Sequence, residues 1–537
     1  MKVKPTPLLL FIRSCNMQRR QLLKSLAGVA GMSASSLVLG SPFAELAHAS
    51  AGIDASSKTD LLVKAKQAFN SAIKTSPTLL GLQNTNGNFP PQALTIEGKL
   101  PKDIQGVLYR NGPAKFERGE QRYLHQFEGD GMVNSFTFAE NKITHQGKFV
   151  QTTKFVAEQQ KNQFLYSGPL SQLENSRNVS HADTVNTANI NVIPVNDEVW
   201  ALWESGSATA LDAKTLATKR RVNLGDNSQY GDKLKGLAFS AHPKVEPNGD
   251  IWNFGLSLSG HVALYQLSAK GIVKNVGMIN AHYRGRMLHD FLITHKHILL
   301  ILPSLSTKAI GDPSATGLFN SIQYDNNLPM QVLVIDKQSL TLKRQFELDA
   351  GFAFHFGNAW EENDGTIHFD ASINTNFDVI DELSELMSGK LRSLDNSPNT
   401  ALFTLHANGT TSKSIIEGDS EFPRVYDHVV GQRNKNLYSL SHTRSNYWRD
   451  TVCCLNVDNG EKDNFVYGED FIAEEHIIVS SKAEEGSGYL VGMALHIPSK
   501  RSCLNIFNAS QLSAGPICRA WLPYHLPLGL HGSFKAA

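Results

Sequence analysis

The sequence predicts an all-β protein built as a β-propeller, and three observations predict this class. From about residue 100 onward, the chain reads as short apolar or alternating runs separated by turn pairs. A degenerate strand–turn–strand unit recurs at wide spacing, and helical periodicity is scarce. An array of β-sandwiches is the rival arrangement, but the wide spacing and the continuous composition favour a single propeller.

Composition places the 537-residue chain among globular proteins with a large core. Hydrophobic residues make up 41% and charged residues 19%, which excludes a disordered chain. The formal net charge of +1 leaves nothing to neutralise a row of phosphates, so nucleic-acid binding is not expected. Gly and Pro are plentiful, at 41 and 21 residues, as many turns require.

The expected strands are short apolar runs, and the expected hairpins follow from the breaks between them. Examples of the runs are Ile251 to Ser259, Val262 to Leu267, His297 to Leu302, Val332 to Ile335 and Tyr489 to Leu495. Asn-Gly and Asp-Gly pairs favour tight turns between antiparallel strands. They stand at Asn248–Asp250, Asn363–Gly365, Asn408–Gly409 and Asn459–Gly460.

The recurring unit has an Asx residue at the start of a turn. It appears as Leu211–Leu216, Ile335–Leu340 and Phe507–Leu512. The Asx side chain can accept a hydrogen bond from the backbone two residues on, which closes the turn between two strands.

Two segments are predicted to be amphipathic helices, Asp60 to Ile73 and Phe377 to Leu391. Packing on one end of the barrel is the simpler interpretation for both. The functional interpretation is a lid or an apolar lip over a substrate mouth.

The N-terminus is predicted to be an export signal over residues 1–49. The Arg19–Arg20 pair precedes a weakly apolar stretch from Leu26 to Leu39, and Ala47–Ala49 supplies a small-x-small cleavage pattern. This resembles a bacterial twin-arginine signal; an ordinary secretory signal or a membrane anchor is the alternative. We expect translation to start at Met17 and the mature protein to be periplasmic, with peripheral membrane contact as a further expectation.

The mature chain divides into residues 50–99, a helical or extended segment packing on the propeller, and residues 100–537, the propeller itself. Its four cysteines are Cys453, Cys454, Cys503 and Cys518. None has the spacing of a zinc knuckle, and free or buried thiols are expected. A bridge between Cys503 and Cys518 is the alternative that an oxidising compartment would permit.

Four of the 19 histidines stand in unusually specific settings. They are His242 in Ala241–Lys244, His289 in Leu288–Thr294, His355 in Phe354–Glu362 and His531 in Gly529–Phe534. Their spacing fits no local zinc motif. In a propeller, however, the innermost strand of each blade faces one axis, so distant histidines can converge on a single ion. We expect the others, such as His282, His295, His297, His368 and His525, to be structural or solvent-facing.

At these residues the sequence resembles the carotenoid cleavage oxygenases, a family that includes stilbene-cleaving dioxygenases and a retinoid isomerase. The resemblance runs from about Leu100 to Phe534. It also includes Gly106–Pro113 and His125–Met132, where Glu128 takes the place of the family's usual Asp. It implies a seven-bladed β-propeller with a cap of helices and loops over an axial metal site.

The resemblance also implies the metal and its surroundings. One non-haem Fe(II) per chain would be held by His242, His289, His355 and His531. Carboxylates behind the ligands would be Glu204, Glu421 and Glu475, which fix the tautomer of a ligating imidazole by accepting from its other N–H. No other catalytic residue is implied beyond the metal centre.

Two departures from the family pattern concern the substrate side. Ile190 stands where many members have Thr beside the open iron position, and the isomerase branch also carries an aliphatic residue there. Leu124 stands where stilbene cleavers usually have Tyr to hold a phenol, which favours an apolar substrate; Lys154 is a second candidate for holding a phenol. The apolar segments Phe164–Tyr166, Leu318–Phe319 and Phe377–Leu391 are expected to form the pocket mouth.

The resulting prediction is an Fe(II)-dependent dioxygenase that uses O₂ to cleave a C=C bond of a carotenoid or apocarotenoid. Cleavage of a stilbene or phenylpropenoid is the alternative within the same fold. An isomerase or a non-catalytic lipid-binding propeller is the alternative of a different class. The expected partners are an apolar small molecule and O₂, with no obligate protein partner.

Overall fold

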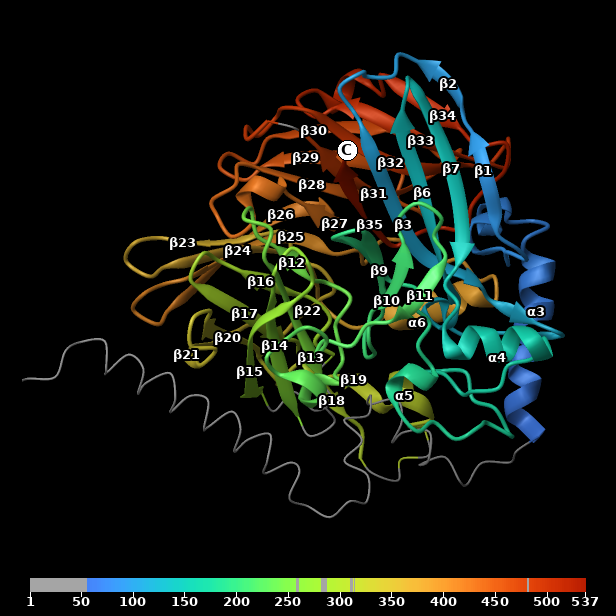
Figure 1. Ribbon diagram of the computed structural model, residues 1–537, viewed down its shortest axis with the longest axis horizontal. Helices are drawn as coiled ribbons and strands as arrows, with labels where there is room; N and C mark the ends of the chain where they lie inside the picture. The colour runs from blue at the N-terminus through green and yellow to red at the C-terminus, as the bar shows by residue number, and fades with distance from the viewer. Residues whose placement is uncertain (1–55, 257–259, 282–286, 310–311, 313, 481) are drawn as a thin grey trace, which may run out of the picture.

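The computed structural model describes residues 56–256, 260–281, 287–309, 312, 314–480 and 482–537. The expected export signal over residues 1–49 lies outside the described residues. In the described part, seven sheets of four or five strands form a β-propeller, as the resemblance predicts (Figure 1). Two further sheets have two strands each.

Each blade is an antiparallel sheet, and the blades follow one another along the chain. In sheet order they are β1 (Phe89–Ala93), β7 (Lys142–Phe149), β6 (Asp130–Ala139), β3 (Gly106–Lys115) and β35 (His531–Ala536) in blade I; β11 (Thr218–Arg221), β10 (Thr209–Asp212), β9 (Glu198–Leu202) and β8 (Asn191–Val195) in blade II; β12 (Lys244–Val245), β13 (Ile251–Leu256), β14 (His261–Leu267) and β15 (Val273–Asn280) in blade III; β16 (Phe291–Ile293), β17 (His297–Leu302), β20 (Met330–Asp336) and β21 (Leu342–Leu348) in blade IV.

The remaining three blades complete the ring. They are β22 (Phe352–Ala353), β24 (Ile367–Asn374), β25 (Asn399–Leu405) and β26 (Thr411–Asp419) in blade V, with β23 (Ala359–Glu361) also paired to β24; β27 (Glu421–Arg424), β28 (Asn436–Ser441), β29 (Thr451–Asn456) and β30 (Lys462–Val466) in blade VI; β31 (Phe471–Val479), β32 (Tyr489–His496), β33 (Arg501–Asn508), β34 (Cys518–Trp521) and β2 (Thr95–Gly98) in blade VII. The small sheets pair β18 (Leu305–Thr307) with β19 (Ile322–Tyr324) and β4 (Glu117–Arg118) with β5 (Gln121–Arg122).

The two ends of the described chain close the ring. The C-terminal strand β35 pairs with β3 from Gly106↔Ala536 to Asn111↔His531, and β2 pairs with β34 at the outer edge of blade VII. Strands therefore begin at Phe89, before residue 100, because β1 and β2 serve as outer strands of blades I and VII.

The apolar core lies between neighbouring blades. One cluster joins Trp252 and Phe254 of blade III to Leu300 and Leu302 of blade IV, and similar clusters fill the other blade interfaces. Strands that are buried on both faces are apolar along their whole length. His297–Leu302 is such a strand, which is why a continuous apolar run there predicts it correctly.

The Asx turns and hairpin signals are confirmed. Asp212 Oδ1 accepts from the Thr215 N–H at 2.8 Å between β10 and β11, and Asp336 Oδ1 accepts from the Ser339 N–H at 2.7 Å between β20 and β21. The third unit, at Asn508, leads from β33 into a 3₁₀ turn before β34. The four cysteines of the described chain are free, as expected.

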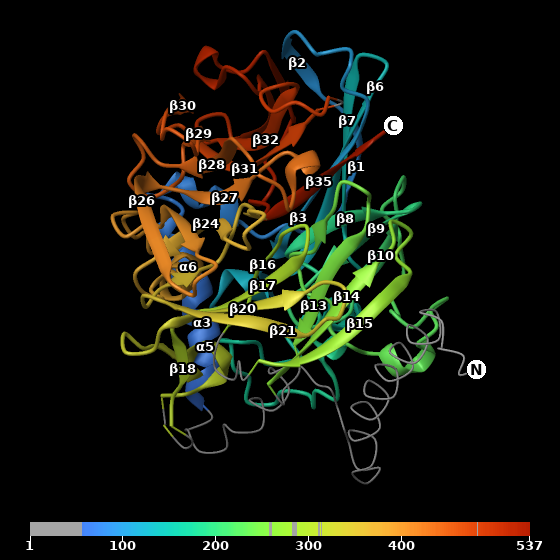
Figure 2. The ribbon, with the colours of Figure 1, turned by 90° about the vertical axis from the view of Figure 1, so that its left-hand side faces the viewer.

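Helices and short turns connect the strands of the propeller. In the described residues they are α3 (Ser56–Ala72), α4 (Thr153–Lys161), α5 (Gly317–Ser321) and α6 (Val379–Met387), with 3₁₀ turns η1 (Pro77–Leu82), η2 (Gln126–Glu128), η3 (Ala182–Thr184), η4 (Gly231–Leu234), η5 (Asp427–Val429) and η6 (Leu512–Ala514). Figure 2 shows α3, α5 and α6 on the same side of the sheets. Within the described residues, no helix is both long and apolar enough to cross a bilayer.

Arg122 connects α3, α6 and η1, which form the cap at one end of the propeller. Its buried guanidinium donates to the carbonyl oxygens of Met387 and Leu82, both at 2.8 Å, and lies 3.5 Å from the centre of the Phe69 ring. These contacts join α6, η1 and α3. Burial lowers the pKa of Arg122 to about 10, which the carboxylate of Glu117 offsets only in part.

Candidate metal centre

The four singled-out histidines stand at the inner edge of four different blades. His242 and His289 lie two residues before β12 and β16, His355 follows β22, and His531 begins β35. The edge strands meet around the axis, because β35 lies beside β8 and β31, and β31 lies beside β27. Each short inner strand therefore directs its histidine to the same place.

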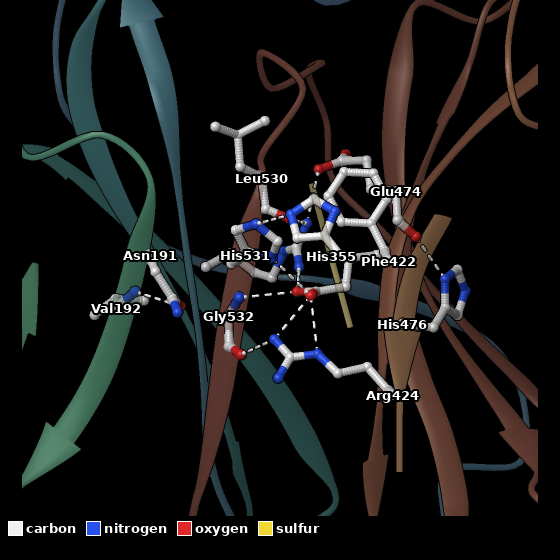
Figure 3. A network of polar contacts seen from close by, with 12 residues as sticks. Asn191, Val192, His355, Phe422, Arg424, Glu474, His476, Leu530, His531 and Gly532 are labelled. Atoms are coloured by element: carbon white, nitrogen blue, oxygen red, sulfur yellow. Dashed lines mark hydrogen bonds and ion pairs between the residues drawn. The ribbon is translucent and has the colours of Figure 1, made fainter. Parts of the chain in front are cut away.

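The structure brings the four imidazoles together. Ligand atoms of His242, His289 and His355 lie within 4.8 Å of one another, and Nε2 of His355 is 3.2 Å from Nε2 of His531 (Figure 3). Two imidazole nitrogens at right angles on one ion, each about 2.1 Å from it, would be about 3.0 Å apart. The spacing thus suits neighbouring ligands of a single metal ion.

The protonation of two of the four imidazoles also suits a metal. Nε2 of His242 is buried and has no hydrogen-bond partner among the described residues. Burial, reinforced by the neighbouring imidazoles, holds the pKa of His242 well below its usual range, and burial lowers the pKa of His531 to about 4 despite Glu475. Both imidazoles are therefore neutral at pH 7, as metal ligation requires.

Three carboxylates lie behind three of the imidazoles. Nδ1 of His289 is 3.0 Å from Oε2 of Glu204, and Nδ1 of His355 is 2.6 Å from Oε2 of Glu421. Nδ1 of His531 is 2.9 Å from Oε1 of Glu475. A carboxylate that accepts from Nδ1–H leaves the Nε2 lone pair facing the axis. Burial would raise the pKa of Glu421, but the adjacent His355 more than offsets this, so the carboxyl pKa is lowered.

We expect a Gln at Glu204, Glu421 or Glu475 to weaken the metal site without abolishing it. The amide keeps the size of the side chain but removes the negative charge, and losing such a partner costs about 10- to 100-fold in metal affinity or activity. Metal content and turnover of the three variants test this.

Glu362→Gln is the matched control for these variants. Glu362 is exposed, and its Oε1 lies 3.0 Å from Nε2 of His368 in the same blade as His355, away from the axis. Unchanged metal content and turnover in all three axial variants would contradict the role given to the carboxylates.

Glu475 is held by two arginines that sequence reasoning did not single out. Nη1 of Arg110 lies 2.6 Å from its Oε2, and Nη2 of Arg424 lies 2.7 Å from its Oε1. Burial raises the pKa of Glu475, but Arg424, His531 and Arg110 more than offset this, and the carboxyl pKa lies well below its usual range. Glu475 therefore stays ionised behind His531.

A β-bulge allows β31 to direct two acidic side chains toward Arg110. The β31–β32 register shifts between Ala473 and His476, so Glu474 and Glu475 depart from simple alternation. Nη2 of Arg110 lies 3.4 Å from Oε2 of Glu474. His476 is structural: its Nε2 lies 2.9 Å from the Tyr467 hydroxyl, and burial lowers its pKa to about 3.

Phe422 is a further residue that the sequence motif contained but did not mark. Its ring stacks on His355 with centroids 5.2 Å apart and lies 5.3 Å from His531. Its φ is 54°, the left-handed region that a bulky residue rarely adopts. Such backbone strain persists where the surrounding structure fixes it, as around a functional site.

A cavity of about 210 Å³ opens onto the imidazoles. Phe127, Ile190 and Phe354 line it on the side of His289, and α6 contributes Leu383 and Leu386. The Ile190 carbonyl accepts from the His531 N–H at 3.3 Å, which places this aliphatic side chain beside the metal site.

Leu124 and Lys154 lie outside the lining of this cavity among the described residues. Leu124 packs against an apolar cluster that contains Tyr123. Nζ of Lys154 is buried 2.8 Å from Oδ1 of Asp130 and 3.1 Å from Oε2 of Glu158. Burial lowers the pKa of Lys154, but the two carboxylates more than offset this, so its charge is already matched.

Of the three segments expected at the mouth, α6 lines the cavity. Among the described residues, Phe164–Tyr166 and Leu318–Phe319 do not line it themselves. They pack in apolar clusters, and the cluster of Leu318 and Phe319 also contains the lining residues Phe127 and Phe354.

Polar side chains from the sequence motifs fix the backbone around the site. Nδ2 of Asn191 donates to the Ala241 carbonyl at 2.8 Å, which fixes the chain just before His242. Nδ2 of Asn189 donates to the carbonyls of Phe127 and Gly129, and the Glu128 side chain caps η2 by accepting from the His125 N–H at 3.1 Å.

Several of the remaining histidines lie beside carboxylates, among them His297 beside Glu361 and His368 beside Glu362. Nδ1 of His297 is 2.6 Å from Glu361, and half-buried His368 stacks on Trp360 with centroids 4.0 Å apart. His295 is exposed beside Glu361, His525 is partly buried, and His282 lies outside the described residues.

Comparison with known proteins gives a consistent result along nearly the whole described chain. The family model described as "Retinal pigment epithelial membrane protein" matches residues 82–536. The chain is 28% identical to the apocarotenoid-15,15′-oxygenase of Synechocystis sp., over 82% of this chain and 92% of that protein. It is 27% identical to the lignostilbene-α,β-dioxygenase isozyme III of Sphingomonas paucimobilis, over 83% and 94%. The crystal structure of the cobalt-substituted Synechocystis oxygenase superposes with a TM-score of 0.77 at 26% identity, covering 86% of this chain and 99% of that one.

Proposed function

The chain belongs to the carotenoid oxygenase family, and we propose that it is an Fe(II)-dependent dioxygenase that cleaves a C=C bond of a carotenoid or apocarotenoid. The observation that carries this is the convergence of four imidazoles, three of which are backed by carboxylates and line a largely apolar cavity: His289, His355 and His531. In this reaction one C=C bond and one O₂ molecule give two carbonyl products, and each product contains one of the two oxygen atoms.

His242, His289, His355 and His531 would hold the iron, which supplies O₂ activation when bound. Imidazole ligands alone do not select iron over copper or zinc, so metal supply must contribute. Glu204, Glu421 and Glu475 keep three imidazoles oriented and offset the ion's charge.

The cavity residues position the substrate and exclude water. Phe127, Ile190 and Phe354 present apolar surface beside the imidazoles. Burying a CH₂-sized unit of a polyene against such surface contributes roughly 0.8 kcal/mol. A conjugated chain is thereby held along the apolar wall with a double bond near the site.

The test is aerobic incubation of the iron-loaded protein with a panel of polyenes and stilbenes, with products identified by mass. With ¹⁸O₂ we expect two carbonyl products, each carrying one labelled oxygen. A geometric isomer as the sole product would favour an isomerase, and the absence of any turnover with bound iron would favour a lipid-binding protein.

Cleavage of a stilbene or phenylpropenoid is the second candidate, supported by the similarity to the lignostilbene dioxygenase. A phenol needs a polar partner, because burying its hydroxyl unpaired costs about 1–3 kcal/mol. Leu124 cannot provide one, and Lys154 is already paired. Competitive turnover decides: a much higher kcat/KM for a hydroxystilbene, lost in Lys154→Ala, would make this the function.

We also propose that the protein reaches the periplasm by twin-arginine export, on the strength of Arg19–Arg20. This route carries folded proteins and so suits a metal loaded in the cytoplasm. Changing both arginines to Lys is expected to leave precursor in the cytoplasm, which fractionation and immunoblotting measure. Continued export of the Lys–Lys variant would contradict the route.

A further inference from the structure

One part of the cavity wall carries donors that nothing in the described structure satisfies. We call Asn374, Ser397, Trp448 and Arg449 the donor wall. Nδ2 of Asn374, Oγ of Ser397, Nε1 of Trp448 and Nε of Arg449 are buried without a hydrogen-bond partner, and all four residues line the cavity that opens onto the imidazoles. Asn374 itself is only 6% exposed.

The donor wall forms one region, because blades V and VI bring its members together. Ile373 pairs with Asn399, and Asn399 in turn pairs with Asp419 at the end of β26. Oδ1 of Asp419 accepts from Nη2 of Arg449 at 2.9 Å. The strand ends that carry Asn374 and Ser397 are thus linked to the loop of Trp448 and Arg449.

The four unpaired atoms of the donor wall can be satisfied by a hydrogen-bond acceptor. The indole nitrogen of Trp448 and Nε of Arg449 can only donate. This holds even if the O and N atoms of the Asn374 amide were exchanged. Buried donors are normally paired, so several in one place indicate a ligand atom that accepts. Apolar residues such as Phe127 and Phe354 line the other part of the cavity, near His289.

The charge of the donor wall favours a neutral acceptor. Arg449 already pairs with Asp419, and Glu421 also lies close enough to interact with its charge. A carboxylate on the ligand would add a negative charge to this group. A carbonyl oxygen accepts through two lone pairs and brings neither charge nor a further donor.

We propose that the donor wall determines specificity by binding a neutral carbonyl oxygen of the substrate, so that carbonyl-bearing apocarotenoids are preferred over hydrocarbon carotenoids. This rests on the proposed function and deepens it. The donor wall fixes the carbonyl end, and the apolar part of the cavity holds the polyene so that a double bond lies beside the imidazoles.

The test is anaerobic titration of the iron-loaded protein with an apocarotenal and with the polyene hydrocarbon of the same length, followed by kcat/KM for both in air. Hydrogen bonding to the carbonyl moves the apocarotenal absorption band to longer wavelength. We expect tighter binding of the apocarotenal together with this shift. Trp448→Phe or Asn374→Leu should weaken apocarotenal binding by about five- to tenfold, the size of one neutral hydrogen bond, and reduce the shift.

Trp360→Phe is the matched control, because Trp360 stacks on His368 outside the cavity lining. Hydrocarbon binding should be unchanged in Trp360→Phe, and it should not weaken in Trp448→Phe or Asn374→Leu, because neither change removes apolar surface on the scale of a lost hydrogen bond. Equal affinity of the wild type for the two ligands, or an equal loss for both ligands in Trp448→Phe, would overturn the assignment. Preferential, shifted binding of the apocarotenal without cleavage in air would support the donor wall and overturn the proposed oxygenase activity instead.

Discussion

Replacing His355 by Ala is expected to remove the metal and the activity while leaving the propeller folded. Nε2 of His355 lies 3.2 Å from Nε2 of His531, and among the four imidazoles His355 has the shortest carboxylate contact, 2.6 Å to Glu421. Its loss leaves three ligands and an unpaired Glu421 beside the ion. Imidazole binds iron(II) less tightly than it binds copper(II) or zinc(II). We therefore expect that the three remaining histidines do not retain the iron.

The measurement is metal content by mass spectrometry together with turnover and far-UV circular dichroism. His368→Ala is the matched control, since His368 lies in the same blade but contacts Glu362 and Trp360 rather than the axis. We expect full metal content and activity in that control. Full iron occupancy in His355→Ala would show that the four-histidine assignment is wrong.

Much of the fold could be predicted because local chemistry repeats in every blade. The turn at Asp212 follows from the ability of an Asx side chain to accept from the backbone ahead of it, and the contact to Thr215 is present. The apolar run of His297–Leu302 predicts β17 without error. The helix expected over Phe377–Leu391 is shorter, Val379–Met387, and it ends where Gly389 adopts a left-handed φ of 83° just after the Ser388 C-cap.

Long-range pairing could not be predicted from local pattern. The local sequence of Gly106–Pro113 does not predict that β3 pairs with β35. This pairing includes Asn111↔His531 and positions the imidazole of His531. The assignment of β1 and β2 to the outer edges of blades I and VII likewise depends on contacts between distant segments.

Site residues could be predicted from the sequence only where they lie in motifs whose chemical role is known. The four histidines and three glutamates could be singled out because resemblance gave them roles, and the structure brings each glutamate to one imidazole. Arg110 and Phe422 lay inside quoted motifs, but their roles depend on a buried ion pair and a strained φ that no spacing reveals. The donor wall has no motif, because its side chains come from three places that are distant in sequence: the end of β24, the loop before β25, and the loop of Trp448 and Arg449.

The Arg110 guanidinium is the element of this site on which folding depends most. It is 3% exposed, and it contacts both Glu475, at 2.6 Å, and Glu474, at 3.4 Å. It also donates to the Leu530 carbonyl at 3.2 Å, next to His531. Removing one partner of a buried ion pair leaves an uncompensated charge away from water, which is far more costly than losing an exposed pair.

Arg110→Met is therefore expected to lower the free energy of unfolding by about 3–5 kcal/mol at pH 7. The variant should also bind iron less well, because Glu475 orients His531. Urea unfolding followed by circular dichroism gives the stability, and metal analysis gives the second effect. Arg433→Met is the matched control: its pair with Asp458 is exposed, with contact at 2.8 Å, and should contribute no more than about 1 kcal/mol.

The pH dependence of the free energy of unfolding distinguishes the contribution of the Arg110 charge from that of its packing. The folded pKa of Glu475 is lowered, so its ionised form contributes stability above the carboxyl's ordinary pKa, and that contribution is lost as the pH falls through the folded value. Without Arg110, Arg424 and His531 still lower the pKa of Glu475, but less strongly, and Glu474 loses its arginine partner. The pKa of these carboxyls should therefore rise, and protonation as the pH falls should relieve part of the uncompensated charge. The stability difference between wild type and Arg110→Met should therefore shrink as the pH is lowered from 7 toward 4. A difference that stays constant over this range would mean that Arg110 stabilises the axis through packing of its side chain rather than through its charge.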